Sequence, residues 1–283
     1  MKIYKIVLLF ILILSVRYYP ILAQTDEYKF DTNIAYYSDD IAQKDLYIKE
    51  RCVLDIYYPI NTKHFATVVW FHGGGLTGGE KEIPAALKQK GFCIVGVNYR
   101  LSPKVKSPKY VEDAAAAVAW VFKNIENYGG DTSLIFVAGY SAGGYLTDMV
   151  GLDKKYLAKY NIDANKIAGL ISLSGQAITH FTVREERGIP GTQPIIDELA
   201  PLYHVRKDAP PLVLITGDSE LELLGRYEEN AYLMRMMKIS RHTKTKLFKL
   251  DGYDHGITEA AFPIMVKEIK KLSKEISENK NNY

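Results

Sequence analysis

The chain has 283 residues, of which 47% are hydrophobic and 24% charged, and its formal net charge at neutral pH is only +3. This composition is typical of a globular protein and excludes a disordered, collagen-like or disulfide-scaffold chain. Lys2, Lys5 and Arg17 are the only charged residues before Thr25, so the chain without its first 23 residues is formally neutral. We therefore expect no nucleic-acid partner, because no basic surface is left to bind phosphates.

The first 23 residues resemble a secretory signal peptide. Two lysines precede an apolar run over residues 6–14, and the small residue Ala23 follows before Gln24. A membrane-spanning helix needs about 20 apolar residues, so we expect cleavage after Ala23, a secreted or periplasmic protein and no stable membrane span. Arg17 and Ile21, which stands where cleavage sites prefer a small residue, leave an uncleaved membrane anchor as the alternative.

The pattern of elements predicts an α/β fold. Residues 34–37 and 52–58 have no helix between them in this reading, so they are predicted to pair as an antiparallel edge. From Ala66 onward, strands alternate with helices. The predicted strands are residues 67–71, 92–98, 134–138, 168–173, 212–216 and 246–250, and the predicted helices are residues 108–127, 220–238 and 257–274. We expect a mostly parallel eight-stranded sheet with helices on both faces and ligands beyond the carboxyl ends of its strands.

We expect one catalytic domain over residues 24–283. Residues 176–211 break the alternation with several glycines and prolines and are interpreted as an insertion, or cap, that covers a pocket. Residues 275–283 are rich in lysine and asparagine and predict a frayed tail. Cys52 and Cys93 lie in apolar runs, which favours two buried free thiols, although a disulfide stays open at this point.

The strongest motif follows the predicted strand 134–138. There the sequence reads Gly-Tyr-Ser-Ala-Gly-Gly over residues 139–144, and a helical segment comes next. A serine on a tight strand-to-helix turn is held in a strained conformation that lifts its hydroxyl toward a pocket, and this turn needs small neighbours on both sides. Gly139 and Gly143 meet that need, so Ser141 is the candidate nucleophile. The alternative is an ordinary glycine-rich turn.

A second glycine motif supports this interpretation. Strand 67–71 leads into His-Gly-Gly-Gly over residues 72–75, where backbone N–H groups can face a developing negative charge. We expect Gly74, Gly75 and Ala142 to form an oxyanion hole. A phosphate-binding loop is excluded because no Lys-Ser or Lys-Thr pair closes the motif.

Position along the chain selects one base among six histidines. His255 follows the last predicted strand and lies at the same sheet edge as Ser141, whereas His64, His72 and His242 occupy less suitable positions. His180 and His204 lie in the insertion, where contact with substrate is a weaker reading than an ordinary surface or buried histidine.

The histidine requires a carboxylate to fix its tautomer. Strand 212–216 is followed by Gly217, Asp218, Ser219 and Glu220. Glu220 is the first choice because its distance from the strand end gives the loop room to turn back, while Asp218 suits a turn or a helix cap. Both carboxylates have suitable chemistry.

With the order serine, acid, histidine, the sequence resembles the α/β-hydrolases of the hormone-sensitive-lipase and small carboxylesterase type. Kynurenine formamidase-like and polysaccharide-deacetylating esterases are near relatives of that type. The matching segments are residues 72–75, 98–103, 111–114, 129–131 and 139–144, together with Trp120. The sequence departs from the common pattern at the acid, where relatives usually carry aspartate.

The resemblance implies a serine hydrolase that cleaves carboxylic esters with short acyl groups through an acyl-enzyme, without metal or cofactor. The leader sequence adds the expectation that this hydrolase is secreted. The implied substrate is a small-molecule or glycan-linked ester. An amidase or arylformamidase-type hydrolase, or a non-catalytic binding module on the same fold, are the alternatives. Tyr140 is a candidate for lining the acyl pocket, and Asp113 is interpreted as a structural tie to the segment Tyr99–Arg100.

Overall fold

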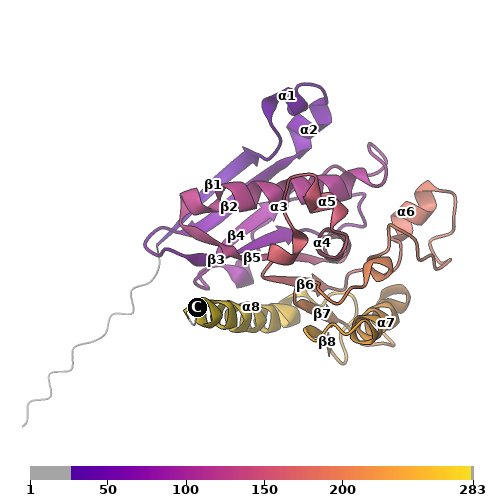
Figure 1. The fold of residues 1–283 in the computed structure, drawn as a ribbon. Helices are drawn as coiled ribbons and strands as arrows, with labels where there is room; N and C mark the ends of the chain where they lie inside the picture. Colours follow the sequence, from indigo (N-terminus) through magenta and orange to yellow (C-terminus); the bar gives the residue numbers. More distant parts are fainter. Residues whose placement is uncertain (1–26, 282–283) are drawn as a thin grey trace, which may run out of the picture.

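The computed structural model describes residues 27–281, so the expected signal peptide lies outside the described residues. Its centre is an eight-stranded sheet in the order β1-β2-β4-β3-β5-β6-β7-β8 (Figure 1). The strands are β1 (Tyr28–Ala35), β2 (Val53–Pro59), β3 (Phe65–Phe71), β4 (Cys93–Val97), β5 (Gly130–Tyr140), β6 (Gly169–Leu173), β7 (Leu212–Thr216) and β8 (Thr245–Lys249). β2 pairs antiparallel with β1 and β4, and the other pairs are parallel, which confirms the predicted sheet.

Helices cover both faces of the sheet. They are α1 (Asp39–Ala42), α2 (Leu46–Arg51), α3 (Lys109–Tyr128), α4 (Ala142–Leu152), α5 (Lys155–Ala158), α6 (Phe181–Glu186), α7 (Arg226–Ile239) and α8 (Thr258–Asn281), with short 3-10 turns η1 (Ala85–Leu87), η2 (Ala164–Lys166), η3 (Pro201–His204) and η4 (Leu223–Gly225). Figure 1 shows α3 and α8 on opposite faces. Along β3, Val69 and Phe71 pack with α3 and α4, while Val68 and Trp70 pack with α8. Both faces are therefore buried, which explains the continuous apolar runs.

The N-terminal edge and the C-terminal tail differ from the prediction. β1 and β2 pair as expected, but α1 and α2 lie between them. The side chain of Asp45 accepts a hydrogen bond from the Tyr47 N–H at the start of α2, which allows so short a helix to form. The predicted frayed tail is helical up to residue 281, because Lys271–Glu275, Lys274–Glu278 and Lys280–Asp131 ion pairs support α8.

The segments beside the carboxyl edge are more irregular than the sequence suggests. The predicted helix 220–238 begins only at Arg226, because Leu224 and Gly225 have positive φ and the chain before them forms a turn and η4. The insertion 176–211 contains α6 and η3 and no strand, as expected. These two segments meet at the edge where the parallel strands end.

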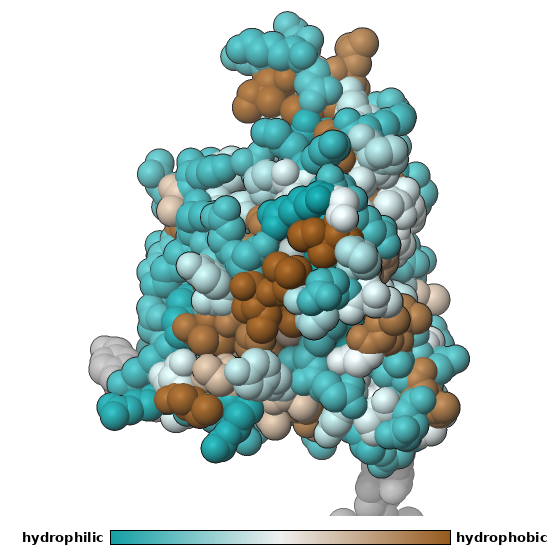
Figure 2. All heavy atoms as spheres, turned by 90° about the vertical axis from the view of Figure 1, so that its right-hand side faces the viewer, coloured by the Kyte–Doolittle hydropathy of each residue, from teal (hydrophilic) through white to brown (hydrophobic). Residues whose placement is uncertain are grey.

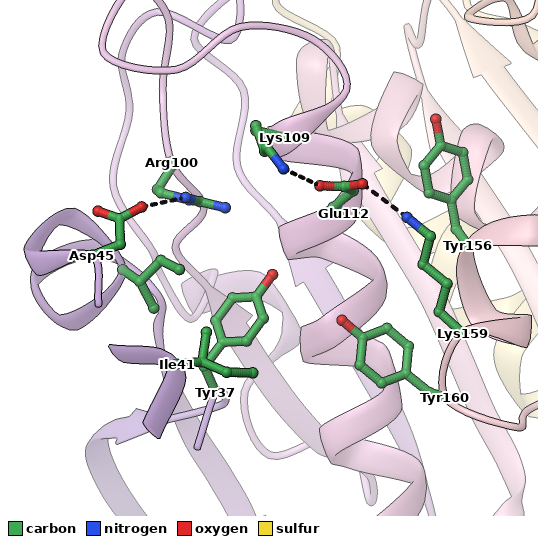
Figure 3. Close-up of a pocket in the computed structure, with 10 residues that line it drawn as sticks. Tyr37, Ile41, Asp45, Arg100, Lys109, Glu112, Tyr156, Lys159 and Tyr160 are labelled. Atoms are coloured by element: carbon green, nitrogen blue, oxygen red, sulfur yellow. Dashed lines mark hydrogen bonds and ion pairs between the residues drawn. The ribbon is translucent and has the colours of Figure 1, made fainter. Parts of the chain in front are cut away.

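Asp113 ties α3 to the end of β4, as predicted. Its carboxylate accepts hydrogen bonds from the backbone N–H and the guanidinium of Arg100 and from the Tyr37 hydroxyl. Arg100 also pairs with Asp45 of the α1–α2 connection, at the wall of a cavity of about 400 Å³ between α2 and α3 (Figure 3). The same figure shows Glu112 pairing with Lys109 and Lys159 on the α3 side of this cavity. The N-terminal helices are thus joined to the central sheet through Arg100.

The helices of residues 27–281 include none that is both long and apolar enough to cross a membrane.

Candidate active site

Ser141 lies between β5 and α4 in a strained conformation. Its φ of 55° and ψ of −115° are rarely adopted by a residue with a side chain. Because Tyr140 ends the strand and Ala142 begins the helix, the serine occupies a sharp turn at the carboxyl edge of the sheet. Its backbone N–H donates to the carbonyl of Leu173 at the end of β6, 2.7 Å away, which holds the turn against the sheet.

The glycines beside Ser141 allow two backbones to meet. A Cβ on Gly143 would lie 2.0 Å from the carbonyl oxygen of Phe71, and one on Gly139 would lie 2.4 Å from the backbone of Gly143. The serine turn therefore packs directly on the end of β3, where the glycine loop (residues 72–79) begins. A Cβ on Gly73 would lie 3.4 Å from the Cβ of Ser141, so the loop passes beside the serine.

His255 meets Ser141, as the sequence predicts. Its Nε2 lies 2.9 Å from the Ser141 Oγ, and its Nδ1 lies 2.6 Å from Oε1 of Glu222. Three side chains from the segments that follow β5, β7 and β8 thus form one chain of hydrogen bonds.

Glu222 is buried and strongly bonded. Besides His255, it accepts hydrogen bonds from the Ser174 hydroxyl and from the N–H groups of Gly217 and Leu223. Burial alone would raise the pKa of this carboxylate, but these bonds outweigh burial and lower the pKa to about 2. At neutral pH the carboxylate only accepts, so Nδ1 of His255 carries a proton and the lone pair of Nε2 faces the serine hydroxyl. This is the arrangement required of a general base.

The expected acids, Glu220 and Asp218, do not contact His255, and Glu222 takes their place. The carboxylate of Asp218 accepts from the N–H groups of Glu220 and Gly252 and closes a turn, as its alternative reading predicted. Glu220 is exposed on the outside of that turn. The carboxylate that contacts His255 therefore lies two residues further along the chain than predicted, because residues 218–221 form a turn before the chain points back toward the sheet.

One feature of the sequence could have indicated Glu222. The Asp-Ser-Glu stretch at residues 218–220 is a turn-forming pattern in which the aspartate side chain bonds the N–H two residues later. A carboxylate after such a turn, rather than within it, is the one that can approach the sheet. The main-chain N–H of Glu222 donates to the Asp218 carbonyl at 2.8 Å, which fixes that approach.

The expected oxyanion donors lie in the glycine loop and at the start of α4. The carbonyl of Gly74 accepts from the N–H groups of Thr77 and Gly78, and that of Gly75 accepts from the hydroxyl of Thr182 on α6. Within residues 27–281, the N–H groups of Gly74, Gly75 and Ala142 have no protein acceptor. They are therefore available to a ligand oxygen.

Tyr140 contacts the catalytic histidine candidate instead of standing free to line a pocket. Its hydroxyl donates to the backbone carbonyl of His255 at 2.8 Å, and the two rings are 5.1 Å apart. The Tyr140 hydroxyl therefore helps to hold the loop that carries His255.

The two histidines of the insertion are engaged in the protein. His180 is fully buried and accepts from the Thr182 N–H at the start of α6, and His204 contacts the carbonyl of Glu198.

Cys52 and Cys93 are both buried and unpaired with each other, which agrees with the free-thiol interpretation. Burial raises the pKa of both thiols. In the part of the chain that the structure describes, no group of three or more His, Cys, Asp or Glu side chains is arranged to hold a metal ion.

Comparison with known proteins agrees with this geometry. The family model described as BD-FAE matches residues 54–223, more than half of the chain. Esterase LipC of Mycobacterium tuberculosis is 24% identical over 245 residues, which cover 78% of this chain and 58% of LipC. The chain therefore spans little more than half the length of this curated relative.

Solved structures show the same fold. A truncated carbohydrate esterase from gut microbiota has a TM-score of 0.70 at 20% identity and covers 89% of this chain and 98% of its own. Inhibited esterase B from Lactobacillus rhamnosis has a TM-score of 0.70 at 18% identity, with 90% of each chain covered. The α/β-hydrolase fold of the hormone-sensitive-lipase and carboxylesterase type, which the motifs predict, is confirmed.

Glu222 is expected to make stability depend on pH. Because folding lowers its pKa from 4.5 to about 2, its ionised form stabilises the native state above about pH 4.5, and this contribution disappears as the pH falls toward 2. It amounts to about 3 kcal/mol in full. We expect Glu222→Gln to be less stable than wild type at pH 7, and the gap in free energy of unfolding to narrow at pH 3, as measured by urea denaturation.

Glu220→Gln is the matched control, since Glu220 belongs to the same loop and is exposed. Its unfolding free energy should follow that of wild type at both pH values. An equal gap between Glu222→Gln and wild type at pH 7 and pH 3 would contradict the role of this buried carboxylate.

Proposed function

This chain belongs to the BD-FAE family, and we propose that it is a serine hydrolase that cleaves carboxylic esters through an acyl-enzyme. The observation that carries the proposal is the continuous hydrogen-bonded chain Ser141–His255–Glu222. The names of LipC and of the structural neighbours, all esterases, support the same reaction class.

The reaction follows from the protonation states of these residues. His255 Nε2 takes the proton of Ser141 while Oγ attacks the ester carbonyl, and Glu222 stabilises the resulting imidazolium. The free N–H groups of Gly74, Gly75 and Ala142 bind the carbonyl oxygen as it becomes negative. His255 then gives its proton to the departing alcohol. Water, activated by the same nitrogen, releases the acid.

The substrate is proposed to be a small-molecule or glycan-linked ester with a short acyl group. Figure 2 shows hydrophobic side chains gathered on the face that carries α6 and α7. Near Glu222, the side chains of Leu221, Leu223 and Leu224 are about half exposed. An organic ester suits such a surface better than a charged polymer. The carbohydrate esterase among the structural neighbours makes an ester carried by a sugar chain a reasonable candidate.

Replacing the nucleophile or the acid is expected to remove activity. Ser141→Ala should lower kcat on p-nitrophenyl acetate by about 10⁴-fold or more, because the nucleophile is gone. Glu222→Gln should lower it by about 10³- to 10⁴-fold, because His255 is then no longer held as an oriented base. A fluorophosphonate probe should label wild type and leave Ser141→Ala unlabelled.

Glu220→Gln is the control from the same loop, and it should retain kcat within about threefold because its side chain is exposed. If a folded wild type takes no probe and cleaves no ester, the fold carries a binding function instead. If Glu220→Gln loses as much activity as Glu222→Gln, the acid is wrongly assigned.

Phe181 is expected to limit acyl length. Its ring lies at the glycine loop, since a Cβ on Gly75 would be 3.2 Å from Phe181 Cζ. Phe181→Ala should therefore raise kcat/KM for p-nitrophenyl octanoate relative to the acetate by about 10-fold. An unchanged ratio in a stable variant would show that this ring does not border the acyl group.

Secretion is proposed from the leader sequence, whose lysines and short apolar run suit export. Amino-terminal sequencing of protein from the culture medium or periplasm should begin at Gln24. A cytosolic chain that retains Met1 would contradict this.

A further inference from the structure

A polar cluster contacts the glycine loop. Its buried members are Arg51 at the end of α2, His72 and Tyr99, and the exposed carboxylate of Glu80 joins it through Arg51. Arg51 is only 7% exposed. Its guanidinium donates to the carbonyls of Tyr99 and Gly79 and to the carboxylate of Glu80. Its remaining contact joins Nη2 to Nε2 of His72, at 3.4 Å.

The contacts of His72 determine its tautomer. Nδ1 lies 2.6 Å from the carbonyl oxygen of Gly73, which can only accept, so Nδ1 must carry the proton. Nε2 faces a guanidinium, which can only donate, so Nε2 must be the bare nitrogen. Burial, together with the nearby charge of Arg51, lowers the pKa of His72 to about 4 and keeps the ring neutral. The two neighbours therefore require the same single tautomer.

The ring is held in place from every side. It stacks on Tyr99 with 4.4 Å between ring centroids, and the Tyr99 hydroxyl donates to the His72 carbonyl at 2.9 Å. A Cβ on Gly79 would lie 2.2 Å from Nδ1 of His72 and 2.5 Å from the Gly73 carbonyl oxygen. Only glycine at that position permits the contact between His72 and Gly73.

The hydrogen bond between His72 Nδ1 and the Gly73 carbonyl fixes the orientation of the Gly74 N–H. The Gly73 carbonyl and the Gly74 N–H belong to one planar trans peptide, so they point in opposite directions. Holding the carbonyl on His72 therefore fixes the direction of the Gly74 N–H, one of the groups without a protein acceptor in the described chain.

We propose that Arg51 is a positioning residue that acts through His72. By donating to Nε2 it selects the Nδ1–H tautomer, which anchors the Gly73 carbonyl and directs the Gly74 N–H toward the oxyanion. Without Arg51, the Nε2–H tautomer becomes available. Its bare Nδ1 would face the Gly73 oxygen, and the repulsion between lone pairs would turn that peptide. The kinetic consequence rests on the proposed ester hydrolysis, whereas the tautomer itself does not.

The tautomer can be measured in the wild-type protein. Nitrogen-15 NMR of histidine-labelled protein distinguishes protonated from bare ring nitrogens, and His72→Gln identifies the resonances of His72. We expect wild type to carry the proton on Nδ1, and Arg51→Met to show a mixture or the other tautomer. The Nε2–H form in wild type, or unchanged Nδ1–H in Arg51→Met, would overturn the proposal. Even if Arg51→Met does not fold, the Nε2–H form in wild type would by itself overturn the proposal.

Kinetics supply the second readout. Arg51→Met should lower kcat for p-nitrophenyl acetate by about 10- to 100-fold with little change in KM, because the donor acts mainly on the transition state. Arg206→Met is the matched control, since Arg206 also bonds backbone carbonyls, those of Gly151 and Leu152, but at a different part of the molecule. It should retain kcat even if it loses comparable stability.

The outcomes separate this proposal from the proposed function. An active wild type with an equally active, folded Arg51→Met refutes the positioning role and leaves ester hydrolysis standing. An inactive wild type refutes ester hydrolysis, and the NMR result then still decides whether Arg51 selects the tautomer.

Discussion

The site depends on the close packing of two backbones, the serine turn and the end of β3. Gly143 lies so near the Phe71 carbonyl that no side chain fits between them. This contact places Ser141 and the glycine loop side by side, although they are about 70 residues apart in the chain. A larger residue at Gly143 would separate Ser141 from the amides that are proposed to stabilise the oxyanion, even if Ser141, His255 and Glu222 all remained.

The carboxyl edge of the sheet explains why so much of the site could be predicted. Strand ends are visible in a sequence as the points where apolar runs stop, and parallel neighbours bring those points together. Ser141 directly follows a strand, and His255 is the one histidine of the sequence in the loop after the last strand, so their meeting could be expected. The glycine pairs around Ser141 mark close approaches that no other residue allows, which makes that motif unusually informative.

The remaining features depend on loop geometry, which apolar periodicity does not encode. Glu222 stands six residues beyond the end of β7, after a turn whose length is set by the side chain of Asp218. Glu222 is a third acid in this loop, beyond the two candidates Asp218 and Glu220, and its approach to His255 depends on how the turn at Asp218 folds. Likewise α1 and α2 are too short for a periodic signal, and the end of α8 is held by ion pairs rather than by an apolar face. The position of Tyr140 beside Ser141 suggests contact with substrate, but its hydroxyl donates to the His255 carbonyl.

Hydrogen bonds from two segments that are distant in the chain hold the glycine loop. Arg51 from the N-terminal edge bonds the Gly79 carbonyl, and Thr182 from the insertion bonds the Gly75 carbonyl. Insertions of this kind vary most readily among enzymes that share a scaffold, because they shape what enters the pocket. Here such variation has a constraint: an altered α6 that loses the hydroxyl at position 182 releases one end of the loop. In the proposed hydrolase, a change in the insertion that alters substrate preference would therefore also disturb the loop that carries the proposed oxyanion donors.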